Sequence, residues 1–298
     1  MKTKWINTFG IYESIISAPD ATTREKIYRE QLYAPWQQMM QMVAMGGQNS
    51  DEPFAGAKAW HWLTPDQLTS TPEQMTILQA SHAWERGAAA MQKAVDSFTG
   101  DDERIPIEQI EGWLVLAEPM PDRQHDYGYT GGTDFMQPRF VVQYSQPNAY
   151  NLPKLEGAIV HEMHHLIRYK VAPWNIMTAT LADYIVHEGL AESFAAALYG
   201  EAIVGFYVTE FDDAEIATAK QLVGDNLEVT GFDTLRSFIF GDQWTTRTGG
   251  AGIGMPAFGG YAIGYRVVQA FLKKTGCTIQ EATFMSASEI VAASGYFA

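Results

Sequence analysis

The segment IVHEMHHLIRY, residues 159–169, places three histidines and one glutamate within five consecutive positions. His161, Glu162 and His165 form the pattern HExxH, in which the two histidines are four residues apart. On an α-helix this spacing puts both imidazoles on one face, where both can bind a single tetrahedral ion. Glu162 then lies beside the ion, where its carboxylate can accept a proton from a metal-activated water. The pattern therefore predicts a helix that carries a catalytic zinc site.

The histidine cluster has competing explanations. In a chain of 298 residues with 7 histidines, HExxH is expected by chance only about 0.01 times. His164 is turned by about 100° from His165 on a helix, which favours a packing role over binding of the same ion. Glu162 and His165 also match the Glu-x-x-His half-motif of di-iron helix bundles, but no other glutamate has a histidine three residues later. A mononuclear site is therefore favoured.

A third ligand is expected from the segment VHEGLAESF, because two histidines alone do not complete a zinc site. Glu188 follows His165 by 23 residues, enough for a turn and an antiparallel helix to return a carboxylate to the ion. Glu192 lies one helical turn later on the same face and can hold a ligand imidazole in its binding orientation. Burying two unpaired carboxylates in so apolar a helix would cost on the order of several kcal/mol, which a metal would offset. The alternative is a solvated stripe of glutamates, while His187 faces another direction and is expected to be structural.

Helical periodicity dominates the chain on both sides of a short segment rich in β-formers. Two runs typical of strands, WLVLA (residues 113–117) and RFVVQY (residues 139–144), are separated by an expected loop at residues 119–134. The expected helices cover residues 20–45, 71–98, a segment opened by Asn151 and Pro153 that carries HExxH, 179–199 and 261–274. We expect an α+β, mainly helical protein with a helical N-terminal region at residues 1–110 and a catalytic domain at residues 111–298.

Composition limits the classes of partner. The formal net charge is −15, so the electric field of the protein would repel a nucleic-acid backbone. No stretch approaches the roughly 18–20 apolar residues that a membrane span needs, and the N-terminal segment lacks the apolar core of a signal peptide. The single cysteine, Cys277, excludes a disulfide framework and a multi-cysteine metal site. We expect a cytoplasmic protein that binds neither nucleic acid nor membranes, and its oligomeric state stays open.

The motifs HEMHH and HEGLAE together resemble the gluzincin metallopeptidases, in which a glutamate from a following helix completes the HExxH site. Within that group, the chain is similar to the YjaZ-like predicted zinc-dependent proteases, in which GYAIGY is also typical, over residues 113–276. The resemblance implies a zincin-like core with a short sheet above the HExxH helix. It also implies His161, His165 and Glu188 as zinc ligands, Glu162 as general base and Glu192 as a partner of a ligand imidazole.

The segment GGYAIGYRVV supplies candidate donors for the oxyanion that forms during peptide hydrolysis. The resemblance implies a tyrosine or histidine from a later helix in this role, and Tyr261 and Tyr265 share one helix face. Core tyrosines with satisfied hydroxyls are the alternative for both. Gly260 and Gly264 would let a substrate backbone or a neighbouring helix approach closely. We also expect the strand at residues 139–144 to pair with an extended peptide, as gluzincin edge strands do.

These patterns predict a zinc-dependent peptidase that cleaves a peptide or protein substrate with a metal-activated water and Glu162 as base. Two other functions fit the same residues: a non-catalytic zinc protein that binds peptides or regulates another protein, and a hydrolase of non-peptide amides. A structural zinc normally has four protein ligands, which this sequence does not obviously provide. The GxMEN motif with which many gluzincin aminopeptidases bind a free α-amine is absent, so an aminopeptidase is not supported.

Overall fold

The computed structural model describes residues 1–45, 52–101, 103–119, 127–172, 175, 177–247 and 249–298. The chain forms two compact units, one of residues 1–95 and 108–162 and the other of residues 96–107 and 163–298. The chain passes from one unit to the other inside helix α7 (Leu155–Val171), between Glu162 and Met163. The expected boundary at residue 110 falls inside strand β2 (Gln109–Leu116), and the division into an N-terminal region and a catalytic domain stays a prediction.

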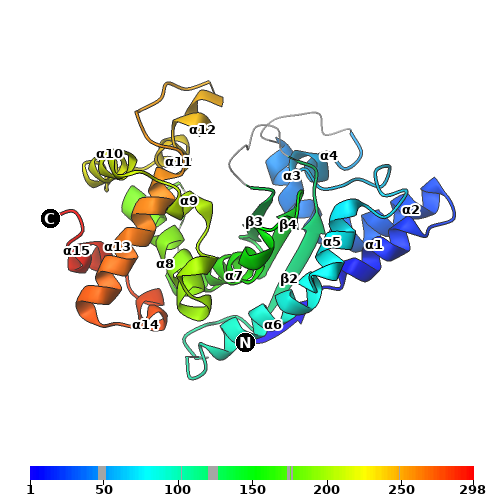
Figure 1. Cartoon of the computed structure of the whole chain (residues 1–298), viewed down its shortest axis with the longest axis horizontal. Coiled ribbons are helices and arrows are strands. Elements are labelled where there is room, and N and C mark those ends of the chain that lie inside the picture. The colour runs from blue at the N-terminus through cyan, green and yellow to red at the C-terminus, as the bar shows by residue number, and fades with distance from the viewer. Residues whose placement is uncertain (46–51, 102, 120–126, 173–174, 176, 248) are drawn as a thin grey trace. The chain divides into compact units, whose positions relative to one another are not determined.

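The first unit is built on a small mixed sheet with the strand order β1-β2-β4-β3 (Figure 1). β1 (Lys2–Trp5) and β4 (Arg139–Tyr144) both pair in parallel with β2, and β3 (Tyr129–Asp134) pairs antiparallel with β4. Two expectations are therefore wrong. β3 occupies the end of the segment that was expected to be a loop, and β4 lies between two strands, so β4 cannot be the edge that receives a peptide. The edge beside β4 is β3, and the helical N-terminal region also contributes a strand, β1.

Helices fill most of the remaining N-terminal part of this unit. They are α1 (Thr8–Ile16), α2 (Ala21–Ile27), α3 (Gln37–Met45), α4 (Ala55–Ala59), α5 (Glu73–Ala80) and α6 (Ala83–Asp96). The helix expected at residues 20–45 starts as predicted, because the Asp20 side chain accepts a hydrogen bond from Thr23 N at 2.7 Å. The helix expected at residues 71–98 is interrupted between α5 and α6, where His82 has a φ of 55°.

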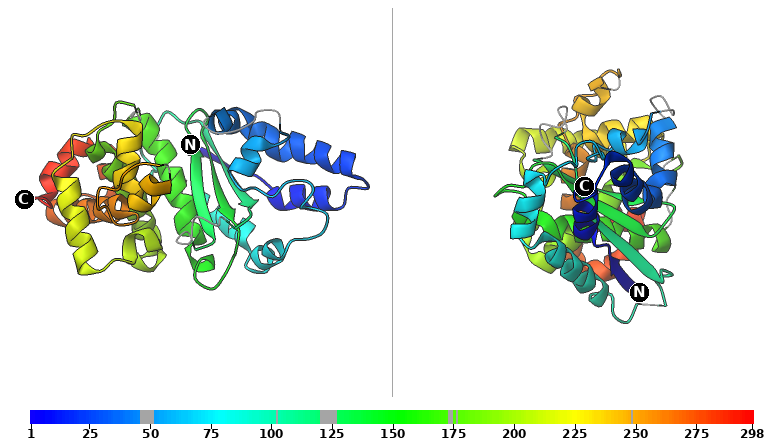
Figure 2. Two further views of the ribbon diagram at one scale, coloured as in Figure 1. Left: turned by 90° about the horizontal axis from the view of Figure 1, so that it is seen from above. Right: turned by 90° about the vertical axis from the view of Figure 1, so that its right-hand side faces the viewer.

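Pro35 changes the type of helix without ending the helical run. The chain passes from α2 through a π turn (Tyr28–Tyr33) and a 3-10 turn (Ala34–Trp36) into α3. Proline has no N–H to donate to the preceding turn, so the regular α-helical hydrogen-bond pattern cannot continue through it. The irregular turns deliver Trp36 to the core, where its ring lies edge-on against Trp62 and Trp113 at 5.9 and 6.1 Å. Figure 2 shows the helices of residues 8–45, in blue, on one side of the sheet.

The second unit is helical apart from its connecting segments. It contains the second half of α7, α8 (Leu181–Tyr199), α9 (Phe206–Thr209), α10 (Asp213–Gly224), α11 (Phe232–Phe240), α12 (Asp242–Arg247), α13 (Gly259–Thr275), α14 (Ile279–Thr283) and α15 (Ala287–Ser294). A reciprocal capping box of Thr180 and Asp183 starts α8. Both α8 and α13 begin and end within two residues of the helices that the sequence predicts.

Two glycines allow α8 and α13 to pack at close range (Figure 1). A Cβ atom at Gly189 would collide with the backbone of Gly264, and one at Gly264 would collide with the carbonyl of Ile185. Gly260 meets the backbone of α11 at Phe238 and Ile239 in the same way. Of the two explanations that the sequence left open for Gly260 and Gly264, these contacts support a neighbouring helix.

The protein is α+β and mainly helical with a small sheet, as the sequence predicts. A zincin-like arrangement of the core stays a prediction. Within the described residues, no helix combines the length and the apolar character that crossing a membrane requires.

Candidate metal centre

His161 and His165 lie one turn apart on α7, and both side chains are buried. α7 follows a 3-10 turn at Leu152–Lys154 that contains Pro153, at a position where a missing N–H costs no helical hydrogen bond. The apolar side chains along the same helix, Ile159, Val160 and Met163, are completely buried. The polar HExxH turn is therefore embedded in a hydrophobic environment, where metal ligands are shielded from water.

The third member of the group comes from α8. One ligand atom each of His161, His165 and Glu188 lies within 4.8 Å of the others. His165 Nε2 and Glu188 Oε2 are 3.2 Å apart, and all three residues are no more than 6% exposed. The structure thus brings together the three residues that the sequence proposes as ligands, although Glu188 lies on a different helix from His161 and His165.

The donors fit a zinc ion. Zinc binds imidazole nitrogens and carboxylate oxygens at about 2.0–2.2 Å, so its ligand atoms lie within about 4 Å of one another. Atoms that are already within 4.8 Å need only small side-chain movements to reach that geometry. A carboxylate as buried as Glu188 also requires a nearby positive charge, because desolvation penalises an uncompensated anion. Among the described residues the group has three members, the number that leaves one zinc position for water or substrate.

Glu162 is half-buried and lies against the edge strand β3. A Cβ atom at Gly131 would overlap the Glu162 carboxylate. Because side chains alternate along a strand, the next residue faces the other side of the sheet, and a Cβ atom at Gly132 would meet only Trp60, at 3.9 Å. The glycine at position 131 therefore makes room for the predicted base between the HExxH helix and the strand edge.

Glu192 lies one turn after Glu188 on α8 and is buried. Its Oε1 accepts a hydrogen bond from Gly205 N and its Oε2 accepts one from the Tyr207 hydroxyl, both at 2.7 Å. These bonds tie α8 to the start of α9. The expected support of a ligand imidazole by Glu192 stays a prediction, and the contacts to Gly205 and Tyr207 give the residue an additional structural role.

The two other buried histidines pack around the metal group. The His187 ring stacks on His165 with centroids 4.3 Å apart and planes at 10°, and Tyr169 stacks on His187 at 4.9 Å. Burial lowers the pKa of His187 well below its usual value, so its imidazole is neutral in this stack. His164 lies with Nε2 3.0 Å from Thr283 Oγ1. Within the described residues neither histidine belongs to the metal group, which agrees with the packing roles expected for both.

The two candidate oxyanion donors on α13 have different surroundings. The Tyr265 hydroxyl donates to Glu201 Oε2 at 2.5 Å, and burial, then this hydrogen bond, raises the pKa of Tyr265. Tyr261 lies in an aromatic cluster with the rings of Tyr207, Phe240 and Phe258, at 5.2, 5.7 and 6.1 Å. The hydroxyl of Tyr265 is therefore already engaged by a carboxylate, a contact that no local sequence pattern indicates.

Residues 83–292 match the model of a protein family described as "Predicted Zn-dependent protease (DUF2268)". The chain belongs to this family. The matched region includes α7, α8 and α13, and the match confirms the resemblance to predicted zinc-dependent proteases that the motifs indicate. The uncharacterized protein YjfC of Bacillus subtilis (strain 168) is 31% identical over 294 residues, which are 97% of each chain. No significant match to a solved structure was found.

Two residues near the metal group of this predicted Zn-dependent protease were not identified from the sequence. Tyr184 precedes Glu188 by one turn on α8, and burial, followed by the negative charge of Glu188, raises the pKa of Tyr184. The four-residue spacing from Glu188 is a signal that could have identified Tyr184. Arg236 of α11 interacts electrostatically with Tyr184, and no motif marks it.

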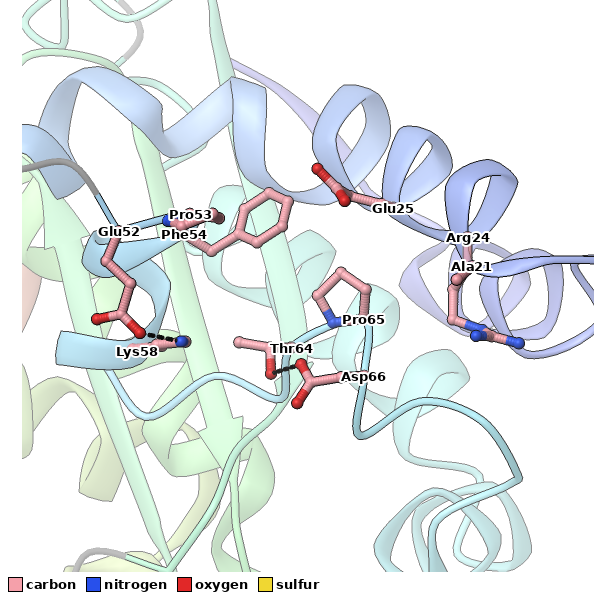
Figure 3. A pocket seen from close by; sticks show the side chains of 10 residues that line it. All are labelled: Ala21, Arg24, Glu25, Glu52, Pro53, Phe54, Lys58, Thr64, Pro65 and Asp66. Carbon is pink, nitrogen blue, oxygen red and sulfur yellow. Dashed lines mark hydrogen bonds and ion pairs between the residues drawn. The ribbon is translucent and has the colours of Figure 1, made fainter.

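A separate pocket of about 260 Å³ lies in the first unit (Figure 3). Among its lining residues Lys58 pairs with Glu52 and Thr64 Oγ1 donates to Asp66 Oδ1 at 2.6 Å, whereas Arg24 Nε is buried without a hydrogen bond. None of the residues that line it belongs to the metal group.

Proposed function

We propose that this protein is a zinc-dependent peptidase in which His161, His165 and Glu188 hold the ion and Glu162 is the general base. The observation that supports it most strongly is the buried group of two imidazoles and one carboxylate, carried by α7 and α8 directly beside Glu162. Membership of a family described as predicted Zn-dependent proteases supports the same reading. Peptides or proteins are the proposed substrates, and neither nucleic acid nor a membrane is required.

The metal ligands and Glu162 have separate roles in the proposed reaction. A zinc ion in this group would supply Lewis-acid activation of water and of the substrate carbonyl. Glu162 takes a proton from the attacking water and passes it to the leaving amine. The reaction needs no protein nucleophile. The half-buried position of Glu162 suits this role, because the carboxylate is held by the fold and can still reach water.

β3 is the proposed substrate edge. It is the last strand of the sheet beside β4, and the Gly131 backbone lies against Glu162. An extended peptide can add to such an edge through main-chain hydrogen bonds, which position the peptide independently of its side chains. A peptide on β3 would thus run next to the base, an arrangement that β4 cannot provide because β4 is paired on both sides.

Tyr261 and Tyr265 are proposed as the groups that stabilise the oxyanion. The Tyr265 hydroxyl already donates to the Glu201 carboxylate and would have to leave it. A hydroxyl aimed at the developing charge is worth more than one that must first break a charge-assisted hydrogen bond.

A three-residue group favours catalysis over a purely structural zinc site, since structural sites are normally closed by four protein ligands. The experiment that tests the proposal compares zinc-loaded wild type with Glu162→Gln on a mixed peptide library, with products identified by mass spectrometry. Both proteins are first assayed for bound zinc. We expect equal zinc content and a loss of turnover of about 100-fold to 10,000-fold in the variant, the range of general acid–base catalysis.

Three results would decide between the alternatives. Undiminished turnover by a clean preparation of Glu162→Gln would contradict the assignment of the base. Absence of peptide cleavage by zinc-loaded wild type would favour a non-catalytic binding or regulatory protein, or a hydrolase of non-peptide amides. Cleavage that disappears on removal of zinc and returns when zinc is added back would support the peptidase.

A further inference from the structure

Arg236 of α11 is surrounded by aromatic rings, and Asp233, one turn earlier on the same helix, acts on it electrostatically without forming an ion pair. Its guanidinium carbon lies 5.0, 5.1 and 4.0 Å from the ring centroids of Phe232, Phe240 and Trp244. Its Nε is buried without a hydrogen bond, and within the described parts of the chain its side chain makes neither a hydrogen bond nor an ion pair. Contacts with ring faces stabilise the positive charge, but they do not provide a hydrogen-bond acceptor for the buried Nε–H.

Two other partly buried arginines, Arg86 and Arg168, use their donors, whereas Arg24 Nε is also buried without a hydrogen bond. Arg86 Nη2 lies 2.6 Å from Glu156 Oε2, and Arg168 Nη1 donates to the Thr283 carbonyl at 2.6 Å. A guanidinium normally satisfies its planar fork with oxygen acceptors, and a carboxylate matches that fork with two parallel hydrogen bonds. Arg236 is therefore a half-buried cation that lies against aromatic rings and has no carboxylate within ion-pair distance among the described residues.

The second unit places this cation next to the metal group. α11 packs against both α8 and α13. Burial lowers the pKa of Arg236, and the hydroxyls of Tyr184 and Tyr261 act in the opposite direction, which puts both tyrosines within electrostatic range of the guanidinium. Tyr184 is in turn within electrostatic range of Glu188, which is one helical turn further along α8. Arg236 is thus linked electrostatically, through Tyr184, to the turn of α8 that carries Glu188.

We infer that Arg236 binds a carboxylate of the peptide substrate and so fixes its position relative to the metal group. This inference rests on the proposed peptidase function and adds the substrate class: peptides that carry a carboxylate near the scissile bond. The rings of Phe232, Phe240 and Trp244 hold the guanidinium plane, which lowers the entropy lost when the carboxylate binds. With a net charge of −15, the protein as a whole repels such peptides, so recognition depends on a local cation of this kind.

The carboxylate can come from the C-terminus of the peptide or from an acidic side chain, and a matched set of peptides separates the two sources. One sequence is prepared as the free acid, as the C-terminal amide, and as the amide with an internal glutamine replaced by glutamate. Dissociation constants are measured by calorimetry with zinc-loaded Glu162→Gln protein, in which binding proceeds without turnover. We expect one carboxylate-bearing peptide to bind about 10-fold to 100-fold more tightly than the neutral amide, as for a hydrogen-bonded ion pair.

Variants of the arginine test whether this preference belongs to Arg236. In the Glu162→Gln background, Arg236→Gln is expected to reduce the preference to less than about 3-fold, and Arg236→Lys to retain part of it, because lysine keeps the charge but loses the fork. Arg247→Gln is the matched control, since Arg247 is exposed and lies over the same Trp244 ring, at 4.7 Å. Arg247→Gln should leave the preference unchanged. The amide comparison needs no variant, so it tests the carboxylate preference even if Arg236→Gln fails to fold, and Arg236→Lys then tests its dependence on the arginine.

The outcomes separate this inference from the proposed function. A preference for the free acid assigns Arg236 to the C-terminal carboxylate, and a preference for the internal glutamate assigns it to a side chain. Equal binding of all three peptides, no binding of any, or a preference that survives Arg236→Gln would overturn the inference. Cleavage without a carboxylate preference would leave the peptidase intact and reject the role of Arg236. An Arg236-dependent preference in a protein that never cleaves peptides would support the role of Arg236 and reject the peptidase.

Discussion

Glu188 is the residue whose burial makes least sense without a metal ion. Its carboxylate is 6% exposed and lies 3.2 Å from His165 Nε2. Replacing it with glutamine keeps the size of the side chain and removes both the charge and an anionic ligand. We expect Glu188→Gln to weaken zinc binding by more than about 100-fold. This effect is larger than that of losing a residue that only hydrogen-bonds a metal ligand. The zinc-free protein should be no less stable than zinc-free wild type, because an uncompensated buried charge is gone. Zinc titration and thermal melts measure both; stoichiometric zinc in the purified variant would contradict the assignment.

Glu192→Gln provides the contrast, because Glu192 accepts hydrogen bonds on both oxygens, from Gly205 N and the Tyr207 hydroxyl. An amide can accept on one atom only and faces one of these donors with its own NH₂ group. The variant is therefore expected to lose about 1–3 kcal/mol of unfolding free energy with or without zinc. Two glutamates one turn apart on α8 thus respond in opposite ways, which separates a ligand from a structural acceptor.

Sequence reasoning at this scale succeeded where local spacing decides the geometry. His161 and His165 are four residues apart on one helix, and Glu188 is on the next, so helix periodicity almost determines the group. It failed where a residue's partner is distant in sequence. The Glu201 acceptor of Tyr265 is 64 residues away, and the aromatic surroundings of Arg236 depend on how α11 and α12 fold together.

At the scale of elements, β3 offers a matched pair of substitutions. Gly131 faces Glu162 with no space for a Cβ atom, whereas Gly132 faces the opposite side with Trp60 as its nearest neighbour. We expect Gly131→Ala to displace the base and lower kcat by about 10-fold to 100-fold, because small misplacements of catalytic groups are costly. Zinc content should not change, since the metal ligands are on α7 and α8. Gly132→Ala should retain wild-type turnover. Equal kinetics of the two variants on a peptide substrate would show that β3 does not position Glu162.

The elements that the sequence predicts correctly are the ones with a strong local pattern. α8 and α13 have clear caps and periodicity, and β2 and β4 are apolar β-branched runs. β3 was not predicted because YTGGTD contains two glycines, which are typical of a loop. Pairing with β4 stabilises this segment as a strand. The break at His82 was missed because a single residue with positive φ leaves no mark in a helical periodicity.

At the scale of the whole molecule, the two comparisons cover different lengths. The family match begins at residue 83, but the similarity to YjfC extends over 97% of both chains. Before residue 83 lies β1, which pairs in parallel with β2 more than a hundred residues later in the chain. No sequence pattern predicts such a pairing, since a four-residue polar segment gives no strand signal by itself. The N-terminal region therefore shares the sheet with the segment that leads into α7.

Removal of zinc should affect the stability of the holoprotein, because the ion would join α7 to α8. A ligand present at 1,000 times its dissociation constant stabilises the folded state by about 4 kcal/mol, which for a chain of this size corresponds to a shift of roughly 6 °C in Tm. We expect a chelator to lower the Tm of wild type by this amount and added zinc to restore it, as followed by scanning calorimetry. Glu188→Gln is the control and should show a much smaller response to either addition. If metal analysis confirmed that the chelated wild type is zinc-free and its Tm were unchanged, the group of His161, His165 and Glu188 would not be a zinc site, because binding to the folded state alone must stabilise it.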